Sequence, residues 1–485
     1  MKKILIVSLA IGAVLSTVSC ERELNQFSNV NTFEEEAFKS FTDYRAALDG
    51  VYDAMKGSGY YSGDTGNMNI IPDLTADNLI LSPGGRNTNF RAWSHEFGSD
   101  EGQTTGLYSA AYFAISRANF VLENLDRGIL SATESKQIEA EARALRAILH
   151  FDLARAYCKI PTQSSDAKSS MGLPYVVSTE TKTYERDLNV EQLYSKIIED
   201  LEFAQDNILV SNDTATPFLR GRLNKAAVLG LLSRVYLYNG ENDKALDRGE
   251  KSIALSPSVG SLSNFPSVWS STSQDGTLLE ILNSDAERVT VGASYNQVLS
   301  NGQIRSEFVV YKSVYDLYTN TDVRKSTYFQ VGPYAGDSYI NVIKYNTRGS
   351  LPNVVNHKYL RTAEVYLNAA EAAYKINPGK ALELLNTLRE QRYTDYVAGT
   401  ETGTALWNAI QKERRLELLG ESDRWFTLKR LGLGLSRPSN EGAFANGSGT
   451  AATSLTLTPD SFKWQWPIPK GAIDLNPKIK QNPNY

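Results

Sequence analysis

The chain has 485 residues, with 50 basic and 55 acidic side chains that give a formal net charge of −5 at pH 7. This mildly negative balance argues against a nucleic-acid partner, because proteins that bind nucleic acid present clustered positive charge. The length is ample for a large buried core and predicts either two domains or one elaborated domain.

The N-terminal segment has the order of a signal peptide rather than of a folded element. Lys2 and Lys3 precede an apolar run over residues 4–15, and small residues then lead to Cys20. The run is too short to remain as a membrane-spanning helix, because a bilayer core of ~30 Å needs about 20 apolar residues. We therefore predict that residues 1–19 are a cleaved signal peptide.

The small residues before Cys20 resemble a bacterial lipobox. That resemblance implies cleavage before Cys20, a diacylglycerol thioether on its sulfur and an acyl chain such as palmitate on its new amine. Several acyl chains, at ~0.8 kcal/mol per buried CH₂, would make a firm membrane anchor. Residues 20–37 would then form a lipidated, polar tether. An ordinary secreted protein with a chance cysteine at this position is the alternative.

Export does not predict a disulfide in this chain. With Cys20 lipidated, Cys158 is the one remaining cysteine, so no intrachain disulfide can form. The stability of the mature protein must therefore come from the burial of apolar surface.

Apolar residues recur at helical spacing in several segments, and each set lines one helix face. In chain order, these segments are residues 108–126, 138–157, 190–208, 228–238, 243–255, 367–374 and 381–388. An Asn-Gly turn at residues 239–240 separates the fourth segment from the fifth. Leu232, Tyr236, Ala245 and Pro257 have the relative spacing of a tetratricopeptide helix hairpin. The chain is therefore predicted to be mainly α, with three or four helix pairs interrupted by insertions.

Three stretches lack a sustained helical period and are predicted to be loops and short strands: residues 60–106, 258–355 and 436–462. The middle stretch is rich in Ser, Gly, Asn and Tyr and contains Pro266, Pro333 and Pro352. Loops on a rigid scaffold often carry function, so we expect ligand-binding residues in these stretches.

No sequence pattern indicates catalysis. Phosphate-loop, dinucleotide-binding, zinc-protease, serine-hydrolase and calcium-loop motifs are absent, and the only histidines are His95, His150 and His357. The chain is therefore predicted not to be an enzyme and to hold neither a metal nor a cofactor. A pair of carboxylates spaced for glycoside hydrolysis can be neither excluded nor identified among 55 acids. An exported lipoprotein hydrolase thus remains the enzymatic alternative.

Several segments resemble, in the same order, the SusD/RagB family of Bacteroidota surface lipoproteins. Residues 138–157, followed by Ile160-Pro161, resemble the family's E-A-x-x-L-R-A helix, and residues 222–238 and 361–372 resemble its tetratricopeptide-like helices. Residues 412–432 resemble its E-R-x-x-E-L and R-W-x-D-L-x-R signature, and residues 466–469 and 476–485 resemble its terminal motifs. The sequence departs from the family pattern at residues 420–423 and at Thr427, where Asp is common.

The resemblance implies a SusD-like domain over residues 38–485, in which tetratricopeptide-like helix pairs form a platform and an irregular, loop-rich subdomain carries the ligand surface. Family members are lipid-anchored at the outer membrane, face the cell exterior and act as lids on TonB-dependent transporters of the SusC type. They capture oligosaccharides or, in some branches, peptides. We therefore expect a non-enzymatic nutrient-binding lipoprotein that delivers a glycan or peptide to such a transporter. A surface adhesin or assembly protein on the same scaffold is the third possibility.

The charged residues of the C-terminal signature could be mistaken for a binding site. They are Glu413, Arg414, Arg415, Glu417, Arg424 and Trp425. The resemblance implies that such residues mainly brace helices against the loop-rich half, and buried polar residues usually satisfy hydrogen-bonding demands. We interpret them as structural.

A sugar-binding surface needs flat aromatic faces for pyranose rings and polar groups for hydroxyls. The early loop offers Asp77, Asn78, Arg86, Asn89, Arg91 and Trp93, and the middle stretch offers Trp269, Tyr295, Asn296, Tyr311 and Tyr334. The early group is favoured, because it falls where characterised relatives place several contacts. Packing is the competing explanation for each residue, since the chain has 26 tyrosines and a binding site uses only a few residues.

Overall fold

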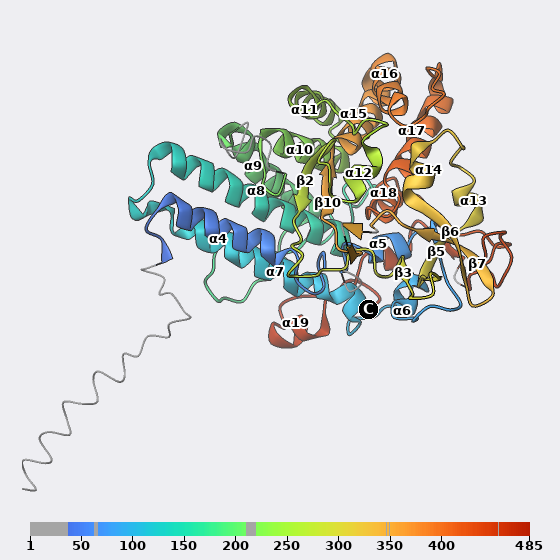
Figure 1. The fold of residues 1–485 in the computed structure, drawn as a ribbon. Coiled ribbons are helices and arrows are strands. Elements are labelled where there is room, and N and C mark those ends of the chain that lie inside the picture. The colour runs from blue at the N-terminus through green and yellow to red at the C-terminus, as the bar shows by residue number, and fades with distance from the viewer. Residues whose placement is uncertain (1–36, 63–65, 210–219, 346, 349, 454) are drawn as a thin grey trace, which may run out of the picture.

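The structure, a computed structural model, describes residues 37–62, 66–209, 220–345, 347–348, 350–453 and 455–485. The predicted signal peptide, Cys20 and nearly all of the predicted tether lie outside these residues. No helix within the described ranges is long and apolar enough to cross a membrane. Long helices dominate one side of the molecule, and short strands and loops dominate the other (Figure 1). The predicted mainly α fold is confirmed.

Long helices pack one after another to form the helical half. They are α4 (Phe41–Ala54), α7 (Gly102–Glu123), α8 (Ala132–Tyr157), α9 (Val190–Asn207), α10 (Lys225–Asn239), α11 (Asn242–Leu255), α15 (Thr362–Ile376), α16 (Pro378–Glu390) and α17 (Gly403–Glu417). Each helix from α7 to α11 contacts the next, and α15 packs on α11, α16 and α17. The predicted helical stripes fall on these helices and are confirmed, although most helices begin some residues earlier. No stripe had indicated α4, which packs on α7 and α8.

The helix ends agree with the local sequence chemistry. Ser131 and Glu134 form a capping box at the start of α8, and Asn189 and Gln192 form another at the start of α9. Helix α10 ends at Gly240, whose φ of 82° lies in the left-handed region that favours glycine. The predicted turn between α10 and α11 is therefore confirmed.

Small residues let α10, α11 and α15 approach one another closely. A Cβ atom at Gly249 of α11 would lie 3.0 Å from the side chains of Ser233 on α10 and Ala369 on α15. The hydroxyl of Ser233 donates to the carbonyl of Ala245 at 2.7 Å. This tight hairpin is the pair that the tetratricopeptide spacing predicted.

The irregular half consists of strand pairs and short helices. The strands pair as β1 (Leu79–Leu81) with β5 (Phe308–Val310), β2 (Thr277–Ile281) with β10 (His357–Arg361), β3 (Gln297–Val298) with β4 (Ile304–Arg305), β6 (Phe329–Tyr334) with β7 (Asp337–Val342), β8 (Thr347–Arg348) with β9 (Leu351–Pro352), and β11 (Leu435–Ser436) with β12 (Thr456–Leu457). The short helices are α5 (Ile71–Leu74), α6 (Phe90–Trp93), α12 (Phe265–Trp269), α13 (Lys312–Tyr315), α14 (Val323–Tyr328), α18 (Arg424–Arg430) and α19 (Lys470–Leu475). The prediction of loops and short strands over residues 258–355 is confirmed except at the short helices α12, α13 and α14, which it did not include. Residues 102–106, which were predicted to be loop, instead begin α7.

A buried carboxylate joins the helical and irregular halves. Glu417, at the end of α17, accepts hydrogen bonds from Arg361 Nη1 at 2.7 Å, Arg392 Nε at 2.8 Å and Arg324 Nη1 at 3.1 Å. All four side chains are at most 2 % exposed. Arg324 belongs to α14 and Arg361 ends β10, both in the irregular half, whereas Arg392 follows α16 of the helical half. Burial raises the pKa of Glu417, but the guanidinium groups of Arg392 and Arg361 outweigh burial and hold that pKa well below its ordinary value.

A second buried pair lies next to Thr427, where the sequence departs from the family pattern. The carboxylate of Asp423 accepts from Arg414 Nη2 at 2.6 Å and from the hydroxyl of Thr427 at 3.0 Å. Arg414 Nη1 also donates to Asn368 of α15 at 2.7 Å. Arg414 thus links α17 to α15 and to the start of α18, and the structural interpretation of Arg414 and Glu417 is confirmed.

Replacing Glu417 by Gln should destabilise the fold strongly. The amide carries no charge, so three buried guanidinium groups would lose a shared counter-charge. Removing one partner of a buried ion pair costs about 3–5 kcal/mol, and we expect a loss of this size in urea denaturation followed by circular dichroism. The matched control Glu383→Gln removes a carboxylate that is 64 % exposed and pairs with Lys380, and should cost less than about 1 kcal/mol. Equal stabilities for the two variants would contradict the role of Glu417.

Two directional hydrogen bonds require His150 to be neutral. Its Nδ1 lies 2.9 Å from the carbonyl oxygen of Arg146, and its Nε2 lies 3.0 Å from the amide nitrogen of Val176. Because an amide N–H can only donate, Nε2 accepts and Nδ1 carries the proton. Burial lowers the pKa of His150 from 6.5 to about 3. The unfolded chain therefore binds a proton that the folded chain does not, and stability falls as the pH drops from about 6.5 towards 3.

The variant His150→Gln should flatten this pH dependence. Gln retains one donor and one acceptor but takes up no proton when the chain unfolds. The slope of the unfolding free energy against pH should fall by up to about 1.4 kcal/mol per pH unit, as measured by urea denaturation between about pH 4 and 6.5. His95 and His357 remain in the variant, so a residual slope is expected. A slope identical to that of the wild type would show that His150 does not contribute.

Candidate ligand-binding site

Three loop-rich stretches that are far apart in the sequence meet at one end of the irregular half (Figure 1). The early loop reaches the β6–β7 hairpin, where a Cβ atom at Gly84 would lie 2.3 Å from the ring of Tyr334. The C-terminal stretch reaches the same hairpin, because the amide of Ala445 donates to the carbonyl of Ser338 at 2.7 Å. The three stretches therefore form one continuous surface.

A buried glutamate orders the early loop. The side chain of Glu307 is 1 % exposed. Its Oε1 accepts the amide N–H of Asn89 at 3.0 Å, and its Oε2 lies 3.5 Å from Arg86 Nη2. The backbone is also close, since the amide of Ser82 donates to the carbonyl of Glu307 at 2.9 Å and a Cβ atom at Gly85 would lie 2.9 Å from Glu307 Cα. The shape of residues 82–89 thus depends on Glu307.

Three of the candidate ligand-binding residues are accessible on this surface. The side chains of Arg86 and Arg91 are 35 % and 57 % exposed, and Tyr334 is half-buried. Arg91 forms an ion pair with Glu101. Because Tyr334 lies over Gly84, its ring adjoins the early loop that also carries Arg86 and Arg91.

The other early-loop candidates are buried and already have structural partners. Trp93 is 3 % exposed; its indole N–H donates to the carbonyl of Leu79 at 3.2 Å, and the guanidinium of Arg437 lies 4.7 Å from its ring centroid. The expectation that Trp93 offers a free face for stacking is therefore not met in this structure. Asn89, 3 % exposed, belongs to the Glu307 cluster.

Asp77 and Asn78 connect the early loop to the C-terminal signature. Asp77 accepts from Arg424 Nε at 2.7 Å and lies 3.4 Å from Arg415 Nη2, whereas Asn78 accepts from Arg415 Nε at 2.8 Å. Burial raises the pKa of Asp77, but Arg415 and Arg424 outweigh burial and lower that pKa to about 2. These contacts confirm the structural interpretation of both arginines.

The middle candidates divide in the same way. Trp269, Tyr295, Asn296 and Tyr311 are each at most 3 % exposed. Among the middle candidates, Tyr334 is the accessible one, and its ring lies against Gly84 of the early loop. Trp269 lies under the ammonium of Lys344, which is 4.2 Å from its ring centroid. Burial lowers the pKa of Lys344 to about 8. A small cavity of about 210 Å³ adjoins both residues.

Sequence reasoning missed Glu307 and Gly84, which position the accessible residues. The Gly84-Gly85 pair was a usable signal, because adjacent glycines often mark a close approach of the backbone to another group. Glu307 had no such signal, since nothing in its local sequence separates it from the other acids of the chain.

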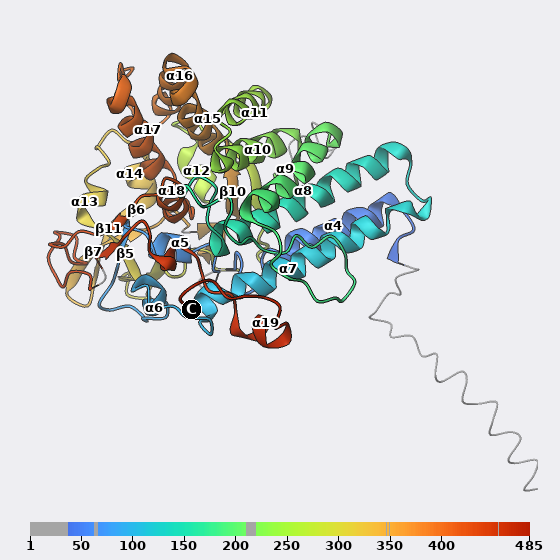
Figure 2. The ribbon, with the colours of Figure 1, turned by 180° about the vertical axis from the view of Figure 1, so that it is seen from behind.

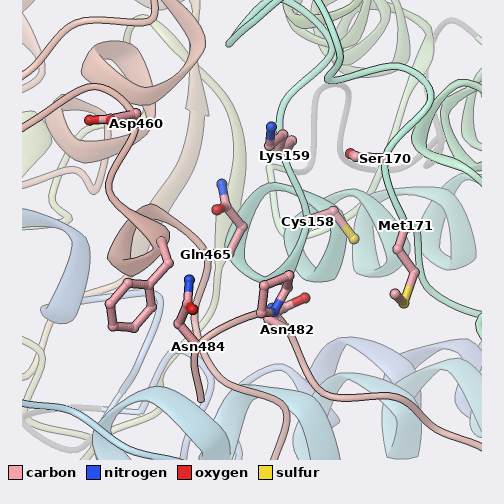
Figure 3. Close-up of a pocket in the computed structure, with 10 residues that line it drawn as sticks. Cys158, Lys159, Ser170, Met171, Asp460, Gln465, Asn482 and Asn484 are labelled. Carbon is pink, nitrogen blue, oxygen red and sulfur yellow. The ribbon is translucent and has the colours of Figure 1, made fainter.

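A separate cavity of about 350 Å³ lies beside the C-terminal segment (Figure 3). Gln465, Asn484 and Lys159 surround it, and Cys158 lies at its side. Burial raises the pKa of the Cys158 thiol, so the thiol stays protonated. The neighbouring Asn482 amide donates to the carbonyls of Tyr157 and Trp466, both at 2.7 Å, and therefore serves the fold. Cys158 is a free thiol, as predicted.

Comparisons with known proteins agree with this architecture. The profile of the SusD family matches residues 290–485, and a profile described as starch-binding associating with outer membrane matches residues 31–237. SusD-like protein P2 of Formosa agariphila is 25 % identical over 458 residues, which cover 82 % of this chain and 85 % of the relative.

Solved structures show the same fold. A putative sugar binding protein from Bacteroides vulgatus matches with a TM-score of 0.80 and 26 % identity, over 93 % of this chain and 99 % of that chain. A SusD superfamily protein from Bacteroides thetaiotaomicron matches with a TM-score of 0.78 and 25 % identity, over 92 % of this chain and 100 % of that chain. The helical platform and the irregular, loop-rich end of this chain are thus the architecture of a SusD-like protein. The chain belongs to the SusD/RagB family, which confirms the resemblance found in its sequence.

Replacing Glu307 by Gln should loosen the early loop. The variant would lose the charge that faces Arg86 and weaken the bond to the Asn89 amide, and a lost hydrogen bond at a buried group costs about 1–3 kcal/mol. We expect faster hydrogen–deuterium exchange in residues 82–89, measured by mass spectrometry. The exposed Glu96 offers a control, and Glu96→Gln should leave exchange unchanged. Unaltered protection in Glu307→Gln would contradict the role of Glu307.

Proposed function

We propose that this chain is a cell-surface lipoprotein that captures an oligosaccharide and delivers it to a TonB-dependent outer-membrane transporter of the SusC type. The observation that carries the proposal is the match to a structure described as a putative sugar binding protein, at 26 % identity and across 93 % of this chain. A second neighbour of the same fold is described as surface glycan-binding protein A from Bacteroides uniformis. The profile of the N-terminal half carries a starch-binding description.

The accessible surface of the irregular half has suitable chemistry for a sugar. The half-buried ring of Tyr334 offers an apolar face for the C–H groups of a pyranose ring, with a polar edge for hydroxyls. Arg86 and Arg91 supply rigid N–H donors. Glu307 and Glu101 partly neutralise these two cations, which favours a neutral ligand over a strongly acidic one. A peptide remains the alternative ligand class.

The lipid anchor belongs to the same proposal. Cys20 would hold the protein at the outer membrane, facing the cell exterior, through residues that precede α4. Helix α4 packs in the helical half, and both views place it at the opposite end of the molecule from the β6–β7 hairpin (Figures 1 and 2). A tether at one end would let the ligand-binding end swing away from a transporter and return to it.

We propose binding without turnover, because no motif or cluster in the described ranges points to a reaction. Groups of three or more His, Cys, Asp or Glu arranged to hold a metal are not found among the described residues. A hydrolase would instead release cleaved glycan, so the two functions differ in a direct product assay.

Calorimetric titration of residues 21–485 with a panel of neutral glycans and peptides tests this function. We expect saturable binding of a glycan, and Tyr334→Ala should weaken it about two- to tenfold, since a stacked aromatic is worth about 0.5–1.5 kcal/mol. The control Tyr396→Ala removes another half-buried tyrosine, which lies between α16 and α17, and should leave affinity unchanged. Glycan recovered cleaved would contradict the non-enzymatic proposal, and saturable binding of peptides alone would contradict the choice of ligand.

A further inference from the structure

A groove of about 330 Å³ lies outside the surface described above. One wall is α7, another is the extended segment of residues 174–184, and the third is α19 with the residues that follow it. Both views show α19 on one side of α6 and the β6–β7 hairpin on the other (Figures 1 and 2). The groove is therefore separate from the loop surface around Tyr334.

Three tyrosines contribute to this groove: Tyr108 and Tyr112 from α7, and Tyr184 from the extended segment. The rings of Tyr108 and Tyr112 are 4.8 Å apart with an interplanar angle of 62°, and the hydroxyl of Tyr112 donates to the carbonyl of Pro174 at 3.0 Å. The hydroxyl of Tyr184 is buried and has no hydrogen-bond partner among the described residues. Because an unpaired buried hydroxyl is unfavourable, a ligand hydroxyl that reached it would be stabilised.

The rim of the groove is polar and nearly neutral. Ser116 and Thr181 are exposed and offer hydroxyl groups. Glu180 and Lys182 balance each other, with 3.9 Å between their charged atoms, and the Lys182 ammonium lies 5.3 Å from the ring centroid of Tyr184. Neutral hydroxyl groups around aromatic walls suit a carbohydrate better than a charged ligand.

The extended wall is held in place although it has no regular secondary structure. Val176 is fixed on both sides, since its N–H donates to His150 at 3.0 Å and its carbonyl accepts from Asn119 at 3.1 Å. At the other end, Asn476 Nδ2 donates to the carbonyl of Tyr184 at 2.7 Å. Such a preformed wall lowers the entropy lost when a ligand binds.

We propose that this groove is a second binding site for a neutral oligosaccharide, an inference that rests on the proposed glycan-binding function. Its volume lies in the range of small-molecule sites, which is about 300–1,000 Å³. Sites on two faces of one chain would also let a long glycan be held at two points, which raises the apparent affinity without any new contact.

The test combines stoichiometry with a local probe on residues 21–485. Hexasaccharides of glucose and of xylose serve as ligands, together with the glycan that binds best in the panel. Calorimetry should give two molecules per chain for the wild type and for the Tyr396→Ala control. Tyr184→Ala should weaken one of the two sites, and Tyr334→Ala should weaken the other. In protein labelled with 3-fluorotyrosine, the resonance that Tyr184→Phe removes should shift when ligand is added, even in a Tyr334→Ala background.

The possible results separate the two claims. One molecule per chain, bound more weakly by Tyr334→Ala, would overturn the second site and leave the proposed function standing. Two molecules per chain with an unchanged Tyr184 resonance would place the second site elsewhere, and would contradict its assignment to the groove. Absence of binding by every glycan would overturn the proposed function, and this inference with it. Tyr184→Phe retains the ring and therefore controls for misfolding of Tyr184→Ala. In Tyr184→Phe, the affinity of the groove for the glycan should fall several-fold.

Discussion

The arrangement of the two halves depends on one buried carboxylate. Glu417 is the common acceptor for Arg361, Arg392 and Arg324, which come from three separate parts of the chain. Arg324 also pairs with Asp322 and Arg361 with Glu421, whereas Glu417 is the carboxylate paired with Arg392. Losing a counter-charge in a protein interior is strongly unfavourable, so movement of these segments away from α17 would be costly. The helical platform and the irregular half are thereby fixed relative to each other.

Further ion pairs extend this connection to the proposed ligand surface. Directly after α17, Asp423 binds Arg414, and Arg424 of α18 binds Asp77 of the early loop. The early loop continues from Asp77 through β1 to the residues that Glu307 orders. A series of charge-assisted hydrogen bonds thus runs from the platform to the loop that carries Arg86, and such bonds are stronger and more directional than neutral ones.

This construction suits the binding function proposed above. Loops that are already ordered by buried partners lose little entropy when a ligand arrives. The residues that do the ordering, such as Asp77 and Glu307, are withdrawn from the surface and leave Tyr334, Arg86 and Arg91 accessible. In this structure, strong buried ion pairs hold the platform and the loops together, and weaker surface contacts are left for the proposed ligand.

Local sequence patterns predicted much of the fold because they depend on near neighbours alone. Apolar spacing indicated the helices from α7 to α11 and the α15–α16 pair, and the Asn-Gly turn and the tetratricopeptide spacing indicated the α10–α11 hairpin. Helix α4 was missed, and the start of α7 was placed too late. The first turn of α7 carries Gly102, Thr104 and Thr105, so its composition resembles a loop until packing buries it.

The sequence by itself determined the fold class, the family and the structural role of the C-terminal charges, because these follow from composition, spacing and ordered motifs. Only the tertiary structure decided which loop aromatics are accessible. Trp93, Trp269 and Tyr334 all lie in loop-rich stretches, yet Arg437 covers the first and Lys344 the second, whereas Tyr334 remains half-exposed over Gly84. Burial depends on what distant segments bring to a residue, and those partners lie 75 positions or more along the chain from the residue they cover.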